Sequence, residues 1–392
     1  MEWKHYKMDD VIDEISMGPF GSDVKKEFYV NKGIPILNGS NLQGFKLQEN
    51  SFGYLTEEKA DSLNKCNAHR GDIIVTHRGT LGQIVYVPSD SKYDRYVISQ
   101  SQFRFRCKPD LVDVQYLVYY FHTREGQYKI LANASQVGVP ALARATSTFR
   151  LIDIKLPSLA DQRRIASILS SLDRKIELNN KINADLEEMA QAIFKNWLSE
   201  CSDDVTIGEL SLNVTNYEKT DAEKVVLINS SDVTEGYFNH HNYSPNKNLK
   251  GHFKKRFQKG DILYSQVRPR NRHWAYCNFD ANDYLASTQL MIIRNNPSLI
   301  TSILLYQYII SDNVWKEFTL KTETRSGTFP QGNYEDLSQI RVPYNSDVEG
   351  ISNQLETLYA KMFMLEKENT HLSLLRDTLL PRLMSGEIEV PE

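Results

Sequence analysis

The stretch LPSLADQRRIASILSSLDRKI, residues 156–176, decides the fold, because a proline that ends a short apolar strand is followed at once by a long heptad pattern. After Pro157 the apolar positions fall at 165, 169, 172 and 176, and the pattern resumes from 183 to 197. Alternating steps of four and three residues are typical of the seam of a coiled coil. The spacing predicts a helix over 159–199.

A second copy of this pattern follows Pro343. Its apolar positions begin at 351, which lies 186 residues after 165, and they continue at the same offset to 383. Asn183 and Asn369 occupy matching seam positions, where a polar residue costs stability but fixes the register or the partner. Each helix could run about 55 Å at 1.5 Å per residue. We expect the two helices to pair in antiparallel fashion, although two core helices of a globular domain would show a similar pattern.

The segments before the two helices also repeat. IPILNGSNLQGF (34–45) matches VVLINSSDVTEGYF (225–238), and RGDIIV (70–75) matches KGDILY (259–264). SQVGVP (135–140) matches RSGTFP (325–330) in the same order. Each copy combines short alternating strands with helices expected near 111–122 and 299–311, so the sequence predicts a duplicated α+β unit.

The bulk composition excludes several classes of protein. A chain of 392 residues with 41% hydrophobic residues is long enough for more than one core, and a net charge of −4 is not that of a generic nucleic-acid-coating protein. The four cysteines are scattered, so neither a zinc site nor a disulfide framework is expected. The N-terminus lacks a signal-peptide pattern and no apolar run is long enough to span a membrane, which predicts a cytoplasmic protein.

The basic residues are concentrated in one segment of the second copy. Residues 250–273 hold eight Lys and Arg residues, Lys250 among them, against the single acidic residue Asp261, and aromatic residues are interleaved. This pattern is typical of phosphate and groove contacts with DNA. Arg268, Arg270 and Arg272 alternate, so in an extended segment all three would point to one face. A solvated loop is the alternative interpretation.

Arginine can read guanine and glutamine can read adenine in the major groove. On this basis the candidate DNA-binding residues are Arg78, Arg95, Gln100, Gln102, Arg104, Lys254, Lys255, Arg256, Arg268, Arg270, Arg272 and Gln289.

The sequence lacks the motifs of the common catalytic sites. It contains no phosphate-binding G-x-x-x-x-G-K-[ST], no G-x-G-x-x-G after a strand, no Asn-Pro-Pro-aromatic element and no H-E-x-x-H. We therefore predict no catalytic residue, no metal site and no cofactor.

The chain resembles the specificity subunits of type I restriction–modification systems over nearly its whole length. The resemblance is carried by Leu156–Leu159, the following DQRRIASIL (161–169), Leu172-Asp173, IFKNW (193–197) and the closing LLPRLMSGEI (379–388). The two Gly-Asp elements match the recognition domains of that family. The copy after Pro343 departs from it, since Asn345-Ser346-Asp347 replaces the usual start of the helix.

The resemblance implies target-recognition domains at 1–158 and 200–344, and spacer helices at 159–199 and 345–392. Each recognition domain would read half of an asymmetric, bipartite site on double-stranded DNA. The helices would set the distance between the half-sites and dock two methyltransferase subunits, through which restriction/translocase subunits would join. Candidate docking residues are Ile168, Ile182, Met189, Phe194 and Trp197. The alternatives are a self-sufficient DNA-modifying enzyme of related architecture and a coiled-coil protein adaptor.

Overall fold

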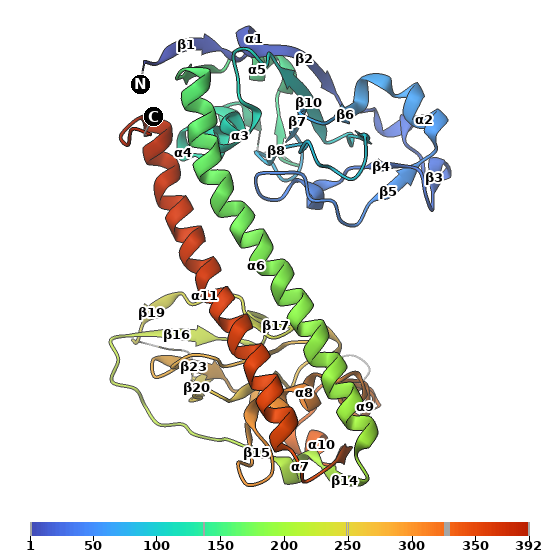
Figure 1. Ribbon diagram of the computed structural model, residues 1–392, viewed down its shortest axis with the longest axis vertical. Helices are drawn as coiled ribbons and strands as arrows, with labels where there is room; N and C mark the ends of the chain where they lie inside the picture. Colours follow the sequence, from blue (N-terminus) through green and yellow to red (C-terminus); the bar gives the residue numbers. More distant parts are fainter. Residues whose placement is uncertain (1, 136–137, 248, 250, 325–329, 391–392) are drawn as a thin grey trace. The chain divides into compact units, whose positions relative to one another are not determined.

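The computed structural model describes residues 2–135, 138–247, 249, 251–324 and 330–390. Lys250, residues 136–137 of the first repeated hexapeptide and residues 325–329 of the second lie outside this part of the chain. The chain forms two compact units (Figure 1): unit 1 is Met1–Glu177 with Asn369–Glu392, and unit 2 is Leu178–Glu368.

Unit 1 is built on two sheets. The first has the strand order β2 (Ile12–Met17), β10 (Gln102–Cys107), β7 (Ile73–Thr76), β8 (Ile84–Tyr86). The second has the order β3 (Tyr29–Val30), β5 (Gly53–Leu55), β4 (Ile34–Ile36), β9 (Arg95–Val97), β6 (Asn67–His69). Two strand pairs are added, β1 (Lys4–Lys7) with β13 (Asp153–Leu156) and β11 (Ala134–Ser135) with β12 (Ala141–Leu142). The helices are α1 (Met8–Val11), α2 (Glu57–Ser62), α3 (Val114–His122), α4 (Arg124–Leu131) and α5 (Ala145–Arg150).

Unit 2 repeats this arrangement. Its first sheet has the order β15 (Ser211–Asn213), β24 (Leu290–Asn295), β21 (Ile262–Ser265), β22 (Trp274–Tyr276). The second has the order β19 (Tyr243–Pro245), β16 (Lys224–Ile228), β23 (Tyr284–Ser287), β20 (Phe253–Lys255). The strand pairs are β14 (Asp203–Thr206) with β25 (Arg341–Tyr344) and β17 (Val233–Thr234) with β18 (Tyr237–Phe238). The helices are α7 (Ile207–Leu210), α8 (Ser302–Ile310), α9 (Asp312–Glu323) and α10 (Tyr334–Ser338).

Two long helices are shared by the units, since each helix contributes one part to unit 1 and the other part to unit 2. Helix α6 spans Leu159–Glu200 and α11 spans Glu349–Ser385. The first matches the expected range, while α11 begins four residues later than the expected start at 345, because Asn345 and Ser346 form a turn in which the Asn345 side chain accepts a hydrogen bond from the Asp347 amide at 3.0 Å. Proline 381 lies inside α11, close to its end.

The heptad positions of α6 and α11 face each other within each unit, where Figure 1 shows the helices side by side. In unit 1, Ile165 and Leu169 share a core with Leu380 and Leu383. In unit 2 the pairs run in opposite directions along the two helices: Asn179 Nδ2 lies 2.8 Å from Glu368 Oε2, and Asn183 Nδ2 lies 3.4 Å from the Met362 carbonyl oxygen. The predicted α+β fold with paired antiparallel helices is confirmed.

The same helices also belong to the cores of the units. Phe194 and Trp197 of α6 pack against Tyr308 of α8, with ring centroids 5.0 and 6.1 Å from that of Tyr308. The heptad pattern therefore serves two contacts, one with the other long helix and one with the α/β core of the unit.

Candidate nucleic-acid interface

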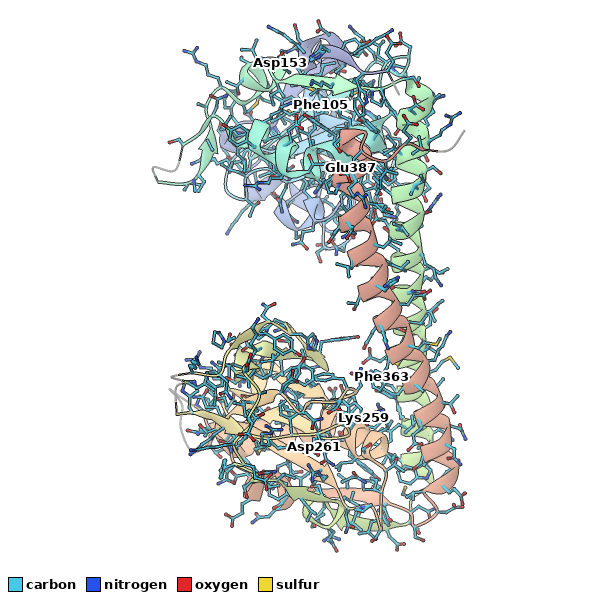
Figure 2. The ribbon with its side chains drawn as sticks, turned by 90° about the vertical axis from the view of Figure 1, so that its left-hand side faces the viewer. Phe105, Asp153, Lys259, Asp261, Phe363 and Glu387 are labelled. Atoms are coloured by element: carbon cyan, nitrogen blue, oxygen red, sulfur yellow. The ribbon has the colours of Figure 1, made fainter. Side chains whose placement is uncertain are left out.

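The repeated Gly-Asp turns fasten the central strands of each unit. Asp261 is fully buried and accepts hydrogen bonds from the Gln258 amide at 2.8 Å and from Arg294 Nε at 2.6 Å. Asp72 is also buried, and it accepts bonds from the His69 amide at 2.9 Å and from Arg106 Nε at 2.8 Å. Figure 2 shows Asp261 among the packed side chains of unit 2. A buried carboxylate paired in this way is structural, since its charge is already satisfied.

At the opposite end of these strands in unit 1, three loops meet. The Gln102 amide side chain donates to the Asn38 carbonyl at 3.3 Å, and the Gln83 side chain donates to the Gly39 carbonyl at 3.3 Å. The His77 amide donates to the Ser101 carbonyl at 2.9 Å. We call residues 38–42, 77–83 and 99–102 the loop edge of unit 1.

Unit 2 builds the same loop edge from residues 229–232, 266–273 and 287–289. The Gln266 amide donates to the Gln289 carbonyl at 2.9 Å, as His77 does to Ser101. The Ser230 hydroxyl lies 3.4 Å from Gln289 Oε1, which joins the first loop to the third.

The repeated prolines bring a fourth segment to each loop edge. In unit 1 the Gly79 amide donates to the Pro140 carbonyl at 2.9 Å, and in unit 2 the Arg268 amide donates to the Pro330 carbonyl at 3.0 Å. Isolated bridges between Arg78 and Ala141 and between Val267 and Gln331 continue the contact. The two edges thus share one backbone framework and carry different side chains.

Arginines are exposed at both loop edges. In unit 1 Arg78 lies in the loop edge and Arg144 follows the segment of Pro140 and Ala141 that contacts it; neither forms an ion pair within the described part of the chain. In unit 2 Arg270 Nη2 lies 2.6 Å from Glu323 Oε2. The Arg272 guanidinium lies 4.2 Å from the Trp315 ring and 3.5 Å from Asp312. Cations held at a surface edge are suited to contact phosphates and base edges.

Three of these arginines have a strained backbone. Arg144, Arg268 and Arg272 have φ values of 47°, 49° and 53°, in the left-handed region that costs a side-chain-bearing residue about 1–2 kcal/mol. Such strain is concentrated at functional sites. The expectation that 268–272 is extended is wrong, because Pro269–Asn271 form a 3₁₀ turn that both flanking arginines enter with positive φ.

Three of the predicted DNA-binding residues are buried and bond to other residues of the protein. Gln102 accepts a hydrogen bond from the Ser99 amide at 2.8 Å, and Arg104 pairs with Asp72 and Glu14. Lys255 Nζ donates to the Leu290 carbonyl at 2.7 Å, and burial lowers the pKa of its ammonium group. The relative exposure of these three side chains is 5% or less, so they are left out of the interface that we propose below.

The other predicted residues lie at the surface. Arg95 binds Asp61 at 2.5 Å, Lys254 lies 5.0 Å from the Tyr217 ring, and Arg256 donates to the Asn282 carbonyl. Gln100 and Gln289 are exposed at the two loop edges. Of the whole predicted set, the loop edges bring together Arg78, Gln100, Arg268, Arg270, Arg272 and Gln289 at the surface, and they also include the buried Gln102.

The predicted docking residues of α6 divide into two groups. Met189 is 52% exposed and Ile182 is half-buried. Phe194 and Trp197 are buried in the core of unit 2, and Ile168 packs against the core of unit 1. Burial depends on the neighbouring α/β core, which heptad spacing alone does not reveal.

Sequence reasoning missed Arg144 and the pairs of Asp72 with Arg106 and Asp261 with Arg294. The sequence repeat could have revealed these pairs, since Arg106 and Arg294 are 188 residues apart, close to the spacing of the two Gly-Asp turns.

Among the described residues, no helix could cross a bilayer, and no cluster of three or more His, Cys, Asp or Glu side chains could hold a metal ion.

Residues 1–188 match the family model described as the type I restriction modification DNA specificity domain. The chain is 35% identical over 136 residues to the type I restriction enzyme HindI specificity subunit of Haemophilus influenzae, a match that spans 34% of this chain and 30% of that protein. It is 23% identical over 423 residues to the type I restriction enzyme MjaIX specificity subunit of Methanocaldococcus jannaschii, spanning 100% and 94% of the two chains.

The fold is similar to that in the crystal structure of the type I restriction–modification system S subunit from M. genitalium, with a TM-score of 0.63 and 16% identity over 100% of this chain and 96% of that one. The sequence matches and the duplicated fold agree: residues 1–188 belong to the family of type I restriction–modification DNA specificity domains, and the whole chain is similar to type I specificity subunits in sequence and in fold.

Proposed function

We propose that this chain is the non-catalytic DNA-recognition subunit of a type I methylation or restriction complex, and that its two domains read the two halves of a bipartite, asymmetric site. The observation that carries the proposal is the loop edge, which is built twice on one backbone framework but carries different side chains. A common framework supports a common way of docking on the duplex. Different side chains support two different half-sites.

The side chains proposed to face DNA lie in or beside the loop edges, and all are exposed except the half-buried Arg272. They are Arg78, Gln100 and Arg144 in unit 1, and Arg268, Arg270, Arg272 and Gln289 in unit 2. Arginine and glutamine each offer two donors or a donor and an acceptor in one plane, which suits guanine and adenine edges respectively. Arginines that do not reach a base would contact phosphates and make binding dependent on salt.

The domain organisation proposed from the sequence is retained: recognition domains at 1–158 and 200–344, joined by helices that set the distance between the half-sites. Two methyltransferase subunits would dock on these helices, and restriction subunits would join through them. Met189 and Ile182 are the proposed docking residues, because they leave apolar surface on α6. The catalytic residues would then belong to the methyltransferase and restriction subunits, and this chain would need no cofactor of its own.

The experiment is a salt titration of duplex binding by the chain assembled with its methyltransferase subunits. We expect affinity to fall steeply with salt, and loop-edge variants to lower affinity for the cognate duplex while the subunits still assemble. Unchanged binding by variants of both loop edges would contradict the proposed interface. Methylation of DNA by the purified chain alone, with S-adenosylmethionine, would contradict the non-catalytic role.

A further inference from the structure

An aromatic ring of unit 1 is exposed to solvent beside its loop edge. Phe20 follows strand β2 and is 81% exposed, more than any other large apolar side chain in the described part of the chain. Its ring has no aromatic or cationic partner among the described residues. Single exposed apolar side chains are common on protein surfaces, so the meaning of this one depends on how the ring is held and on what lies beside it.

The turn that carries Phe20 is restrained on both sides. Pro19, the preceding residue, is buried, and its ring fixes its own φ. The Phe20 amide donates to Asp23 Oδ2 at 3.1 Å, and the Asp23 amide donates to the Phe20 carbonyl oxygen at 2.9 Å. Residues Gly21–Asp23 form a 3₁₀ turn. The backbone of Phe20 is therefore fixed before a ligand binds, which lowers the entropic cost of a contact made by its ring.

The same turn packs against the third loop of the loop edge. A Cβ atom at Gly18 would lie 2.0 Å from the Ser99 carbonyl oxygen, so only glycine permits this approach of two backbones. A Cβ atom at Gly21 would lie 2.5 Å from Gln100 Oε1. Because these two glycines flank Phe20, the exposed ring lies next to Gln100, one of the side chains proposed above to face DNA.

The corresponding segment of unit 2 takes another course. After β15 the Asn216 carbonyl oxygen accepts a hydrogen bond from the Arg256 amide at 2.8 Å, which ties this segment to the end of β20. The next residue is aromatic, but the ammonium group of Lys254 lies 5.0 Å from the centre of this Tyr217 ring. The exposed ring beside the loop edge is thus a feature of the first repeat.

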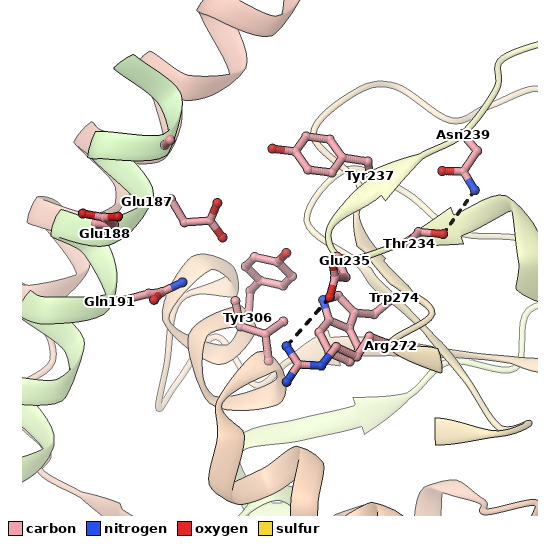
Figure 3. A pocket seen from close by; sticks show the side chains of 12 residues that line it. Glu187, Glu188, Gln191, Thr234, Glu235, Tyr237, Asn239, Arg272, Trp274 and Tyr306 are labelled. Atoms are coloured by element: carbon pink, nitrogen blue, oxygen red, sulfur yellow. Dashed lines mark hydrogen bonds and ion pairs between the residues drawn. The ribbon is translucent and has the colours of Figure 1, made fainter. Parts of the chain in front are cut away.

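The loop edge of unit 2 carries cations that are paired with carboxylates. Figure 3 shows the ion pair of Arg272 with Glu235, in which Arg272 Nη1 lies 3.8 Å from Glu235 Oε1. Arg270 is paired with Glu323 in a similar way. An apolar ring and a set of oriented cations contact bases by different chemistry, so the two units are equipped to recognise different features of a duplex.

We propose that Phe20 inserts between two stacked bases of the half-site that unit 1 reads. This inference rests on the proposed function, because that function places the loop edge of unit 1 on the duplex. Insertion covers both faces of an aromatic ring, whereas contact with a thymine methyl group in the groove covers only part of it. Unit 1 would then select a base step that unstacks readily, such as a pyrimidine–purine step, beside the base that Gln100 reads.

Fluorescence anisotropy tests the proposal with the chain assembled with its methyltransferase subunits, on a duplex that carries the methylated motif of the complex. The test variant is Phe20→Ala, and Phe20→Trp is the conservative variant that keeps an aromatic ring. The matched control is Leu151→Ala, since Leu151 is 64% exposed and lies near the opposite end of β2, where the Met8 amide donates to the Ile152 carbonyl oxygen at 2.8 Å. Melting curves establish that all three variants fold.

We expect Phe20→Ala to bind about 10- to 100-fold more weakly than wild type, because the stacking of an aromatic ring on a base is lost. Phe20→Trp should retain most of the affinity, and Leu151→Ala should bind as wild type does. The dependence of affinity on salt should be the same for Phe20→Ala and wild type, since the substitution removes no charge that contacts a phosphate.

An adenine analogue that fluoresces when it is unstacked, 2-aminopurine, locates the inserted ring. It replaces each purine in turn, except the methylated base, in the half-site that is retained when residues 200–344 are exchanged for those of a relative. At one step the fluorescence should rise when the wild-type complex binds and stay low with Phe20→Ala. If no step brightens and replacement of a thymine by uracil reproduces the loss caused by Phe20→Ala, the ring contacts a methyl group and the proposed insertion is wrong.

Arg78→Ala separates failure of this inference from failure of the proposed function. Normal binding by Phe20→Ala together with weakened binding by Arg78→Ala would overturn the insertion of Phe20 and leave the loop edge on the DNA. Normal binding by both variants would overturn the insertion and would also remove the loop edge of unit 1 from the proposed interface.

Discussion

Arg268 in unit 2 and Gly79 in unit 1 occupy the same backbone position. Both have a positive φ, 49° and 88°, and each donates its amide hydrogen to the carbonyl of the repeated proline, Pro330 or Pro140. Glycine adopts this conformation without strain, whereas arginine pays about 1–2 kcal/mol for it. The second unit thus has a strained arginine where the first shows that glycine is sufficient for the fold, which supports the proposal that this side chain faces DNA.

Arg268→Gly should separate the folding of unit 2 from DNA binding. Relief of the strained backbone should leave the melting temperature of the chain unchanged or slightly higher, while loss of the guanidinium weakens cognate duplex binding by about 1–3 kcal/mol. Fluorescence anisotropy with the assembled complex measures the second effect. Lys224→Ala, at the far end of β16 from the loop edge, is the control and should bind normally. A less stable Arg268→Gly variant with normal affinity would assign this arginine a structural role.

Asp261→Ala should destabilise unit 2 strongly. It removes the buried acceptor of the Gln258 amide and of Arg294, whose Nη2 atom lies 2.8 Å from Asp261 Oδ2. Loss of one partner from a buried ion pair costs about 3 kcal/mol or more. Urea unfolding measures the loss, with the exposed Asp280→Ala as control. Equal midpoints for the two variants would show that the Gly-Asp turn does not fasten the strands.

Met189 and Trp197 should respond in opposite ways to substitution, although both lie on α6. Met189→Ser removes apolar surface that is 52% exposed, so it should weaken methyltransferase assembly in size-exclusion chromatography and leave stability nearly unchanged. Trp197→Ala empties part of the core beside Tyr308 and should cost about 3–5 kcal/mol of unfolding free energy. Normal assembly of Met189→Ser would remove this face of α6 from the docking surface.

The half-buried carboxyl group of Glu366 on α11 should make the free energy of unfolding of unit 2 depend on pH. The pKa of Glu366 is raised to about 7 from an ordinary value of 4.5, so the folded state holds a proton that the unfolded chain releases between these values. The resulting stabilisation is fully present below about pH 4.5 and is lost as the pH rises through 7. Glu366→Gln should therefore melt at a higher temperature than wild type at about pH 8, with the difference shrinking toward about pH 5. A difference that is independent of pH would show that Glu366 does not titrate in this range.

The sequence was sufficient to predict the duplication, the α+β class and the two long helices, because these depend on local periodicity. The heptad spacing after Pro157 and Pro343 holds over many turns, and few alternative structures share it. The helix at 114–122 was likewise predictable from its apolar run.

The candidate site was only partly predictable, because burial of a charge depends on strands that are distant in the sequence. Arg104 and Arg78 look alike as basic residues, yet Arg104 pairs with Asp72 across the sheet and Arg78 is exposed. The turn at Pro269 likewise requires positive φ in two arginines, which no propensity predicts.

The most direct test of the central claim is the methylated-base pattern of DNA from cells that express this chain with its methyltransferase subunit. We expect one motif made of two different half-sites with a fixed gap, and exchange of residues 200–344 for those of a relative should change one half alone. A motif that is continuous, or that keeps both halves after the exchange, would contradict the claim that each unit reads its own half of the site.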